Sequence, residues 1–256
     1  MKILISGIGG RMGAEVKKMV TDGYRGAVLC AGYDVAPVEA ECPIYTSWAD
    51  VNETPDCIID FSHHAGTKAL LDYACEKNIP VVLATTGHDD TEKGYIADAA
   101  KKIPLFHSAN MSLGVALLCE LAKTAAKTFP DADIEIIEKH HNRKLDAPSG
   151  TALLLARSIQ AVRESAFFTF GRQGHAKREK NEIGVHAIRM GNIVGEHEVI
   201  IATPSQTISL KHEAHSRALF AEGALTAAVF VAEQPVGLYD MSSLLSKEKS
   251  TAAVKG

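Results

Sequence analysis

A glycine-rich turn near the start of the chain constrains the fold more than any other feature. Residues 3–5 are apolar and predict a short buried strand, and residues 7–13, Gly7-Ile8-Gly9-Gly10-Arg11-Met12-Gly13, follow it directly. An amphipathic helix is predicted from there to about Val20, and residues 27–33 predict a second strand that ends at Asp34. Such a βαβ unit lets the backbone approach a pyrophosphate, which then lies at the helix N-terminus.

The details of this turn predict a dinucleotide site. Asp34 lies about 20 residues beyond the last glycine, where an acid hydrogen-bonds an adenosine ribose. Met12 stands where the general fingerprint has its third glycine, and Gly13 follows it. Because the strand, the helix and the acid are all in place, we favour the dinucleotide site over a plain tight turn.

Asp34 and its neighbours also bear on the choice of cofactor. The carboxylate of Asp34 can bond both ribose hydroxyls of NAD and would repel the 2′-phosphate of NADP. Val35 follows it, where an arginine would favour NADP, although Arg11 could still reach a 2′-phosphate. We therefore expect NADH to be accepted at least as well as NADPH.

Strands and helices continue to alternate as far as residue 106. We predict strands at 56–61, 81–84 and 105–106 and helices at 65–77 and 92–102. Short loops between alternating elements predict an α/β fold with a doubly wound parallel sheet, which binds ligands beyond the carboxyl ends of its strands. The segments expected on this cofactor rim are 62–64, 85–87 and 108–111. His63 and His64 are more simply explained as helix-capping or surface residues than as catalytic ones.

The pattern changes after Ser112. A helix at about 113–127, a strand near 134–139 and a helix from near Ser149 precede three predicted strands, at 183–190, 193–202 and 207–212. The turns Gly191-Asn192 and Pro204-Ser205 between these last three predict consecutive antiparallel strands. The pattern predicts a second, α+β domain with an open mixed or antiparallel sheet, whose exposed face and edges favour oligomerisation.

These patterns suggest a division of the chain. We expect residues 1–111 and 217–256 to form a dinucleotide-binding domain, because a predicted helix at 218–232 returns the chain to it. We expect residues 112–216 to form a substrate-binding and oligomerisation domain. Residues 171–182 predict a long mobile loop, and residues 247–256 are expected to fray.

Composition excludes several classes of protein. The 27 Lys+Arg and 31 Asp+Glu give a net charge of −4, without the basic field that nucleic-acid binding requires. No apolar run approaches the length of a membrane span, and the N-terminus does not resemble a signal peptide. The five cysteines are widely spaced without a C-x-x-C pair, which predicts reduced thiols in the cytoplasm and neither a zinc site nor a disulfide framework.

Residues 134–151 carry the most chemistry. An alternating apolar and acidic strand is followed by His140, His141, Arg143 and Lys144, and Asp146 comes next. Residues 148–151, Pro-Ser-Gly-Thr, then lead into an apolar helix pattern, so unpaired N–H groups follow the proline. Cationic side chains and a helix N-terminus at one place suit a small anionic substrate.

Three of these motifs together resemble the 4-hydroxy-tetrahydrodipicolinate reductases, bacterial and plant enzymes of the diaminopimelate route to lysine. They are the turn at 7–13, the Thr-Thr-Gly loop at 85–87 and the string at 138–152, E-x-H-H-x-x-K-x-D-A-P-S-G-T-A. The resemblance covers nearly the whole chain, including 191–197 and 212–217, and the last string is highly specific. The family pattern allows the shifted third glycine, and Ala84 stands where the family often has glycine.

The resemblance implies a Rossmann-type domain, a central domain whose sheets assemble a homotetramer, and hydride transfer from NADH or NADPH to a dicarboxylate ring with loss of water. By matching positions, His140 would be the acid/base residue and Lys144 the proton donor. The substrate would be held by His141, Lys144, Gly150 and Thr151. The cofactor would be held by Gly7, Ile8, Gly9, Gly10, Arg11, Met12, Asp34, Ala84, Thr85, Thr86, Ser108, Ala109, Asn110 and Met111.

The chemistry of such a substrate fits these residue types. Its carboxylates need positive charge and N–H donors, which Lys144 and the 149–151 backbone can supply together with the Thr151 hydroxyl. Hydride addition to a conjugated imine leaves an enamine carbon that must be protonated, and a histidine suits that transfer. We expect Asp146 to orient the cluster. Taken alone, a His-His pair or a K-x-D pair is more often inert.

Other functions remain open from the residues. Another nicotinamide reductase is one, such as an amino-acid or semialdehyde dehydrogenase, and the absence of a cysteine nucleophile near the start of the second domain argues against the semialdehyde type. A catalytically silent NAD sensor would have no need of His140 and Lys144. A metal-dependent hydrolase could use His140 and His141 with His212 or His215, but adjacent histidines on a strand point to opposite faces, so we expect no metal site.

Overall fold

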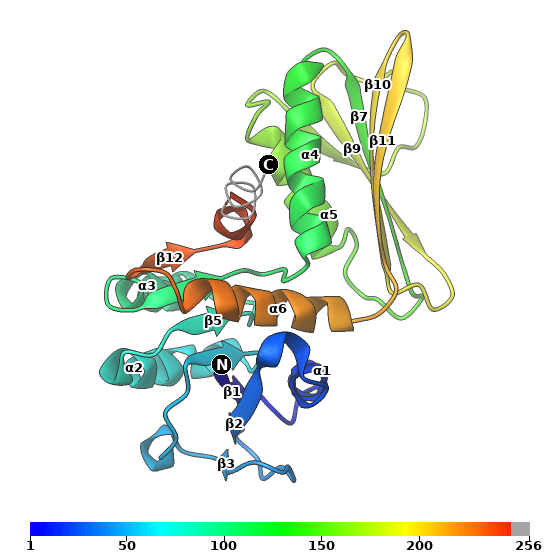
Figure 1. Ribbon diagram of the computed structural model, residues 1–256. Coiled ribbons are helices and arrows are strands. Elements are labelled where there is room, and N and C mark those ends of the chain that lie inside the picture. The colour runs from blue at the N-terminus through cyan, green and yellow to red at the C-terminus, as the bar shows by residue number, and fades with distance from the viewer. Residues whose placement is uncertain (247–256) are drawn as a thin grey trace. The chain divides into compact units, whose positions relative to one another are not determined.

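The computed structural model describes residues 1–246 and contains two compact units (Figure 1). One unit comprises Met1–Ser112 and the described residues from Arg217 on, and the other comprises Leu113–Ser216. Residues 247–256, which were expected to fray, lie outside the described residues.

The first unit is built on a seven-stranded sheet with the order β12-β6-β5-β4-β1-β2-β3. Its strands are β1 (Lys2–Ser6), β2 (Val28–Tyr33), β3 (Ile44–Tyr45), β4 (Cys57–Asp60), β5 (Val81–Leu83), β6 (Pro104–His107) and β12 (Gly237–Tyr239). Every neighbouring pair is parallel, so the doubly wound parallel sheet is confirmed. The edge strands β3 and β12 were not predicted, because two or three residues are too few to show a period.

The helices of the first unit are α1 (Arg11–Thr21), α2 (Thr67–Lys77), α3 (Asp90–Ala99) and α6 (Ala218–Val231), with the short 3₁₀-helices η1 (Tyr24–Gly26), η2 (Trp48–Asp50) and η3 (His64–Gly66). Apolar side chains of α2 and α3 pack with those of β1, β4, β5 and β6 in one core cluster. Helix α6 packs against α1 and against β4, β5 and β6. Its residues are buried almost all round, which explains why its sequence is apolar without a polar stripe.

The second unit has a five-stranded mixed sheet with the order β11-β10-β7-β9-β8. Its elements are α4 (Leu113–Thr128), β7 (Asp133–His140), α5 (Gly150–Gln160), β8 (Phe167–Phe170), β9 (Glu182–Arg189), β10 (Gly195–Thr203) and β11 (Gln206–Ala214). Helices α4 and α5 cover one face of the sheet, where their apolar side chains pack on those of β7, β9 and β10 (Figure 1). The predicted α+β domain with an open sheet is therefore confirmed.

The predicted succession of antiparallel strands is wrong at one point. Strands β9 and β10 are not neighbours, because β9 lies parallel on one side of β7 and β10 lies antiparallel on the other. The Gly191-Asn192 turn instead passes round the end of β7. The Met190 N–H donates to the His140 carbonyl at 2.9 Å, and the His141 N–H donates to the Ile193 carbonyl at 2.8 Å. The turn thus brings the start of β10 to His140.

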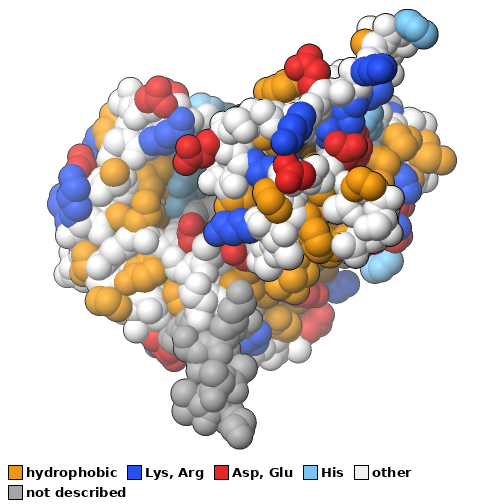
Figure 2. Space-filling model, turned by 90° about the horizontal axis from the view of Figure 1, so that it is seen from above, with side chains coloured by type: hydrophobic (Ala, Val, Ile, Leu, Met, Phe, Trp, Pro, Cys, Tyr) orange, Lys and Arg blue, Asp and Glu red, His pale blue; other side chains and the backbone are white. Residues whose placement is uncertain are grey.

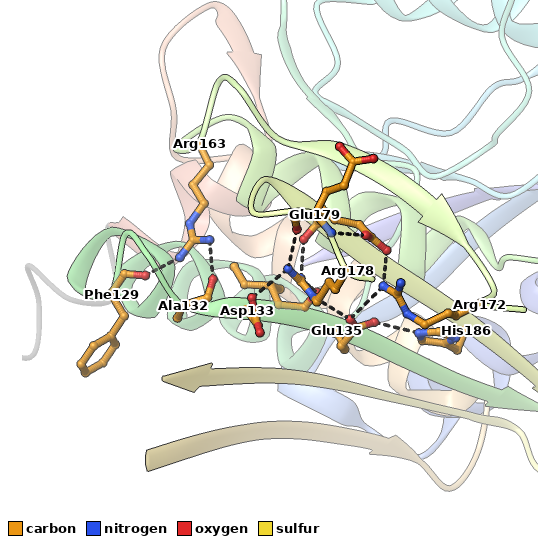
Figure 3. A network of polar contacts seen from close by, with 11 residues as sticks. Phe129, Ala132, Asp133, Glu135, Arg163, Arg172, Arg178, Glu179 and His186 are labelled. Atoms are coloured by element: carbon orange, nitrogen blue, oxygen red, sulfur yellow. Dashed lines mark hydrogen bonds and ion pairs between the residues drawn. The ribbon is translucent and has the colours of Figure 1, made fainter. Parts of the chain in front are cut away.

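The segment predicted as a long loop, 171–182, is irregular up to Asn181 but is tied down near its end (Figure 3). The Arg178 guanidinium donates to Asp133 at 2.8 Å and to Glu135 at 3.1 Å, and it also reaches the carbonyls of Ile134 and Glu182. On the other side of the same carboxylate, Nε2 of His186 lies 2.8 Å from Glu135. Glu135 is therefore a carboxylate held by Arg178 and His186, with the guanidinium of Arg172 3.9 Å away.

The surface carries charges of both signs. Lys and Arg side chains are interspersed with Asp and Glu side chains over the face seen in Figure 2, in keeping with the net charge of −4. Among the described residues, no helix has the length and apolar character needed to cross a membrane.

Candidate functional site

The glycine turn between β1 and α1 is closed by backbone contacts that leave no room for side chains. Gly7 has φ 76°, and a Cβ there would lie 2.8 Å from the Phe61 carbonyl oxygen. A Cβ on Gly13 would lie 2.2 Å from the Gly7 carbonyl oxygen and 2.7 Å from the Ile8 Cα. Gly13 therefore performs the close-packing role of a third glycine, which explains why it can stand one position late.

Asp34 lies against this turn, as its spacing predicts. Its carboxylate accepts the Gly9 N–H at 2.9 Å and the Ala36 N–H at 3.3 Å, so its position is fixed by the backbone. It borders a cavity of about 810 Å³. The cavity is lined by Ser6, Gly7, Gly9, Gly10, Tyr33, Asp34, Val35, Ala36, Pro37, Val38, Trp48, Phe61, Ser62, His63, Ala65, Gly66 and Ala69. No lysine or arginine occurs among these described lining residues.

A second cavity, of about 480 Å³, lies on the other side of the turn. It is lined by Arg11, Met12, Phe61, Ser62, Ala84, Thr85, Thr86, Ala109, Asn110, Met111, Arg217 and Phe220. Phe61 and Ser62 line both cavities, so the two adjoin at the carboxyl end of β4. Arg11 borders this cavity rather than the one beside Asp34, which weakens its expected role at a 2′-phosphate.

Of the predicted cofactor residues, only Ile8 and Ser108 are absent from these two linings. The Ile8 side chain is buried in the core, and the Ser108 hydroxyl donates to the Asn110 carbonyl at 2.7 Å and so shapes the loop after β6. Phe61 was not predicted, although its place just after β4 on the rim could have suggested it. Arg217 and Phe220 come from the distant α6 segment, and no local pattern points to them.

Asp60, the last residue of β4, is a buried carboxylate that the sequence analysis missed. It accepts hydrogen bonds from the Ser62 hydroxyl at 2.6 Å and from the Thr85 hydroxyl at 2.5 Å. Burial raises the pKa of Asp60, and the hydroxyl donors oppose that shift. Because Asp60 is fully buried, it holds two residues of the cavity rim in place rather than contacting a ligand.

In the second unit, His140 and Glu138 lie on the helix-covered face of β7. Burial alternates along the strand so that both side chains share the face of Ile134 and Ile136. The Nδ1 atom of His140 lies 2.5 Å from Glu138 Oε2. Glu138 is 0% exposed and His140 is 8% exposed, so the pair forms a polar end to the core.

Glu138 is satisfied by three groups in all. Arg189 of β9 donates to its two oxygens at 2.8 and 2.7 Å, and the Ser149 N–H donates at 2.9 Å. Burial alone would raise the pKa of Glu138, but the hydrogen bonds from His140, Arg189 and Ser149 outweigh it and lower the pKa to about 2. Glu138 is therefore a carboxylate at neutral pH.

His197 of β10 lies opposite Glu138 in the sheet register. Its ring meets that of His140 edge-on, with 5.2 Å between the centroids, and its Nε2 lies 3.1 Å from the Ser149 hydroxyl oxygen. Burial lowers the pKa of His197 to about 4, and His140 adds to the shift. His197 is therefore neutral at neutral pH, and the sequence analysis assigned it no role.

This shift makes stability depend on pH. Because the folded-state pKa of His197 is about 4 and the ordinary value is 6.5, the unfolded chain binds more protons between these values. The contribution is present above pH 6.5 and is lost as pH falls towards 4. As the pH falls through this range, we expect the free energy of unfolding to decrease by roughly 3 kcal/mol less in His197→Asn than in the wild type.

Urea unfolding at about pH 7 and about pH 4 measures the effect. The exposed His175 offers a matched control, because His175→Asn should leave the pH dependence of the free energy of unfolding unchanged. Equal pH dependence in the wild type and His197→Asn would contradict the assignment.

Lys144 and Asp146 follow β7 in the connecting segment. The Nζ atom of Lys144 lies 2.9 Å from Asp146 Oδ1, with side-chain exposures of 22% and 59%. Asp146 thus contacts Lys144, whereas the partner of the His140 ring is Glu138. Arg143 is exposed and donates to the Asn192 side chain at 3.0 Å. The predicted orienting role of Asp146 therefore extends to Lys144 alone.

The predicted helix start lies beside this cluster. Ser149 is the N-cap of α5, and its hydroxyl accepts the Ala152 N–H at 3.2 Å, while Gly150 and Thr151 take the first two helical positions. The Ser149 N–H is already used by Glu138, so Ser149 is not the substrate donor that the sequence suggested. The groups of this cluster that can bind an anion are the Lys144 ammonium and the N–H groups in the first turn of α5.

The arrangement of possible metal ligands bears on the expectation that the site needs no metal. Among the described residues, no group of three or more His, Cys, Asp or Glu side chains is arranged to hold a metal ion. His140 instead has a carboxylate on Nδ1 and a neutral histidine at its edge.

Comparisons with known proteins agree with this geometry. Residues 1–111 match the family model described as "Dihydrodipicolinate reductase, N-terminus", and residues 114–245 match "Dihydrodipicolinate reductase, C-terminus". A 4-hydroxy-tetrahydrodipicolinate reductase from Caldanaerobacter subterraneus subsp. tengcongensis is 45% identical over 249 residues, covering 96% of this chain and 99% of the relative. One from Clostridium novyi is 44% identical over 250 residues, with coverages of 96% and 99%.

Solved structures share the fold. The dipicolinate-bound dihydrodipicolinate reductase from Paenisporosarcina sp. TG-14 has a TM-score of 0.80 at 26% identity and covers 94% of this chain and 97% of its own. An amine dehydrogenase from Mycobacterium smegmatis has a TM-score of 0.64 at 9% identity, with coverages of 95% and 95%, and shares the fold alone. Since the family models together span nearly the whole sequence, the chain belongs to the dihydrodipicolinate reductase family.

Proposed function

We propose that the chain reduces 4-hydroxy-tetrahydrodipicolinate to tetrahydrodipicolinate with loss of water, using NADH or NADPH, in the diaminopimelate route to lysine. The observation that carries the proposal is a cluster that suits a small dicarboxylate: Glu138 contacts both His140 and the Ser149 N-cap of α5, and the Lys144 charge acts on the adjoining His197. The relatives that bear this enzyme's name match the chain over 96% of its length. The reductase from Paenisporosarcina is described as binding dipicolinate, a dicarboxylate of this kind.

The first unit fits a nicotinamide dinucleotide. The turn at Gly7 and Gly13 has no room for a Cβ, so the backbone itself forms the wall that a pyrophosphate approaches. Asp34 would bind the adenosine ribose beside the larger cavity, and Thr85 and Asn110 would line the nicotinamide side. When bound, the dinucleotide supplies the hydride.

The second unit supplies charge and a proton. Lys144 and the backbone N–H groups of Gly150 and Thr151 would bind the substrate carboxylate, with His141 beside them. Protonation of the enamine carbon would fall to His140, through the Nε2 atom, since Nδ1 is held by Glu138. Lys144 would favour this step by its charge and can itself give a proton.

We further propose a homotetramer assembled through the second unit and a cytoplasmic location. Phe167, Phe170 and Ile188 lie on β8 and β9 and remain 41%, 57% and 39% exposed, so apolar surface is available on this sheet. All five cysteines are free, and widely spaced free thiols are typical of a reducing compartment.

An assay of the wild-type enzyme tests the reaction and the cofactor preference together. With freshly made 4-hydroxy-tetrahydrodipicolinate, we expect NADH to be oxidised with a kcat/KM at least equal to that for NADPH. The reason is that Asp34 repels a 2′-phosphate and no arginine or lysine lines its described cavity. Asp34→Ala should lower kcat/KM for NADH by roughly tenfold, the loss of a charged hydrogen bond, and narrow the difference between the cofactors.

Two results would count against these statements. No oxidation of either cofactor in the presence of substrate would refute the proposed function. A strong preference of the wild type for NADPH would refute the role of Asp34 alone.

A further inference from the structure

A buried carboxylate that is not among the residues expected to touch substrate contacts His140. Glu138 is fully buried, and its Oε2 atom lies 2.5 Å from His140 Nδ1. Both side chains project from the same face of β7, because alternate residues of a strand share a face and Glu138 and His140 follow Ile134 and Ile136 at that spacing. Burying a carboxylate costs free energy unless several hydrogen-bond donors stabilise its charge.

Glu138 receives those donors from two further elements. Arg189 of β9 grips both of its oxygens, at 2.8 and 2.7 Å, and the Ser149 N–H at the start of α5 donates at 2.9 Å. Bidentate arginine pairing fixes the plane of a carboxylate as well as its charge. Glu138 is therefore held in one orientation by groups that do not contact the reacting nitrogen.

The opposite ring nitrogen lies beside a glycine. A Cβ on Gly195 would lie 3.0 Å from His140 Nε2, so a side chain at this position would crowd that nitrogen. The turn that wraps the end of β7 places Gly195 there. One side of the imidazole thus contacts a fixed anion, and the other side faces a residue that has no side chain.

We propose that Glu138, locked by Arg189, is the positioning residue that holds His140 with Nδ1 protonated and Nε2 presented for proton transfer. The inference rests on the proposed function and assigns this residue a part in it. In the step, the Nε2–H bond of the imidazolium breaks and a C–H bond forms at the enamine carbon. The imidazole left behind keeps its Nδ1 proton, which stays hydrogen-bonded to Glu138, and the carboxylate remains charged throughout.

The charges around His140 set the expected pH response. Glu138 on β7 favours the charged imidazole, whereas Arg189 on β9 and Lys144 in the following segment oppose it. His197 on β10 meets the ring at its edge, and His212 lies opposite His197 on β11. With the anion removed, the imidazolium is less favoured, so the basic limb of the kcat–pH profile should move to lower pH.

The same strand provides a matched control. Glu135 is also a carboxylate held by a histidine and an arginine, His186 and Arg178, with Arg172 3.9 Å away, but it lies on the other face of β7 (Figure 3). Glu135→Gln and Glu138→Gln therefore remove the same charge from the same strand and from the same kinds of partner. Only the second change removes the partner of His140.

The experiment compares the wild type, Glu138→Gln and Glu135→Gln in steady-state assays across pH, with NADH binding followed separately by fluorescence. For Glu138→Gln we expect kcat to fall about 10- to 100-fold with KM within about twofold, and the basic limb to move by about one pH unit or more. NADH affinity should stay within about twofold of wild type, and Glu135→Gln should keep the wild-type kcat and limb.

Unchanged kcat and limb in Glu138→Gln, or equal losses in Glu135→Gln, would overturn the inference. If Glu138→Gln does not fold, Glu138→Asp carries the test, because it keeps the charge but shortens the reach by one methylene. A fall in kcat of about fivefold or more at unchanged KM supports the role, and unchanged kcat overturns it. An inactive wild type would refute the proposed function instead, so the two failures are distinguishable.

Discussion

Replacing His140 by glutamine should lower kcat by about 10²- to 10⁴-fold, the usual loss when a general acid–base group is removed. The side chain is 8% exposed and its Nδ1 contacts Glu138, and a glutamine amide in its place has no acidic proton to transfer at neutral pH. Lys144→Ala should raise KM and lower kcat together, because the ammonium both attracts the carboxylate and adds charge to the proton-transfer site. Steady-state kinetics with 4-hydroxy-tetrahydrodipicolinate measure both effects.

Arg143 gives the control for Lys144. It is a cation one residue away, but it is exposed and donates to the Asn192 side chain, so Arg143→Ala should keep activity within about twofold of wild type. NADH binding should be unchanged in all three variants, since the dinucleotide residues belong to the other unit. Wild-type turnover in both His140→Gln and Lys144→Ala would refute the assigned roles.

Gly13→Ala should damage the nucleotide site more than an added methyl group at any other glycine of the turn. The added Cβ would lie 2.2 Å from the Gly7 carbonyl oxygen and 2.7 Å from the Ile8 Cα. Both atoms are backbone and cannot rotate away, so the turn itself must open. We expect the free energy of unfolding to fall by at least about 2 kcal/mol and NADH affinity to fall by roughly 10²-fold. Denaturant unfolding and fluorescence titration with NADH measure the two losses.

Gly94 offers the matched control for this substitution. It lies within α3, where an added Cβ meets nothing within 4 Å. Gly94→Ala should therefore leave NADH binding unchanged and stabilise the protein by up to about 1 kcal/mol through helix propensity. If Gly13→Ala bound NADH as tightly as the wild type, the proposed contact of the turn with the dinucleotide would be wrong.

The first unit could be predicted well because its signals are local. A glycine turn between a strand and a helix, and an acid at a fixed spacing, depend on residues that are close in sequence, and the structure places Asp34 against Gly9 of that turn. Buried parallel strands show as short apolar runs. The strands β3 and β12 escaped because they are short pieces at the edges of the sheet.

The second unit was predicted less well because its pairing is not local. The turn at 191–192 had the residues of a hairpin, but β7 was inserted between the two strands that it joins. Local propensities cannot show that β7, which lies about 50 residues earlier in the chain, is inserted between these strands. The pairing is stabilised by packing β7 against a neighbouring strand on each side.

Glu138, the buried carboxylate, was not predicted as part of the cluster around His140 for a similar reason. Asp146 was expected to orient the cluster, because it lies near the lysine in sequence. The alternation of Ile134 and Ile136 does place Glu138 on the same face as these two apolar residues, and that is a local signal for its burial. The arginine that completes the arrangement, Arg189, is 51 residues away from Glu138, so only the fold reveals it.

The first unit is interrupted in sequence, and this has a consequence for how the protein is made. During translation, residues 1–112 emerge from the ribosome long before α6 does. Helix α6 packs against β4, β5 and β6 and brings Phe220 to the smaller cavity. Gly223 of that helix fits so tightly on the Met111 carbonyl that a Cβ would lie 1.7 Å from it. A nascent chain would therefore bind NADH only after translation has passed the entire second unit.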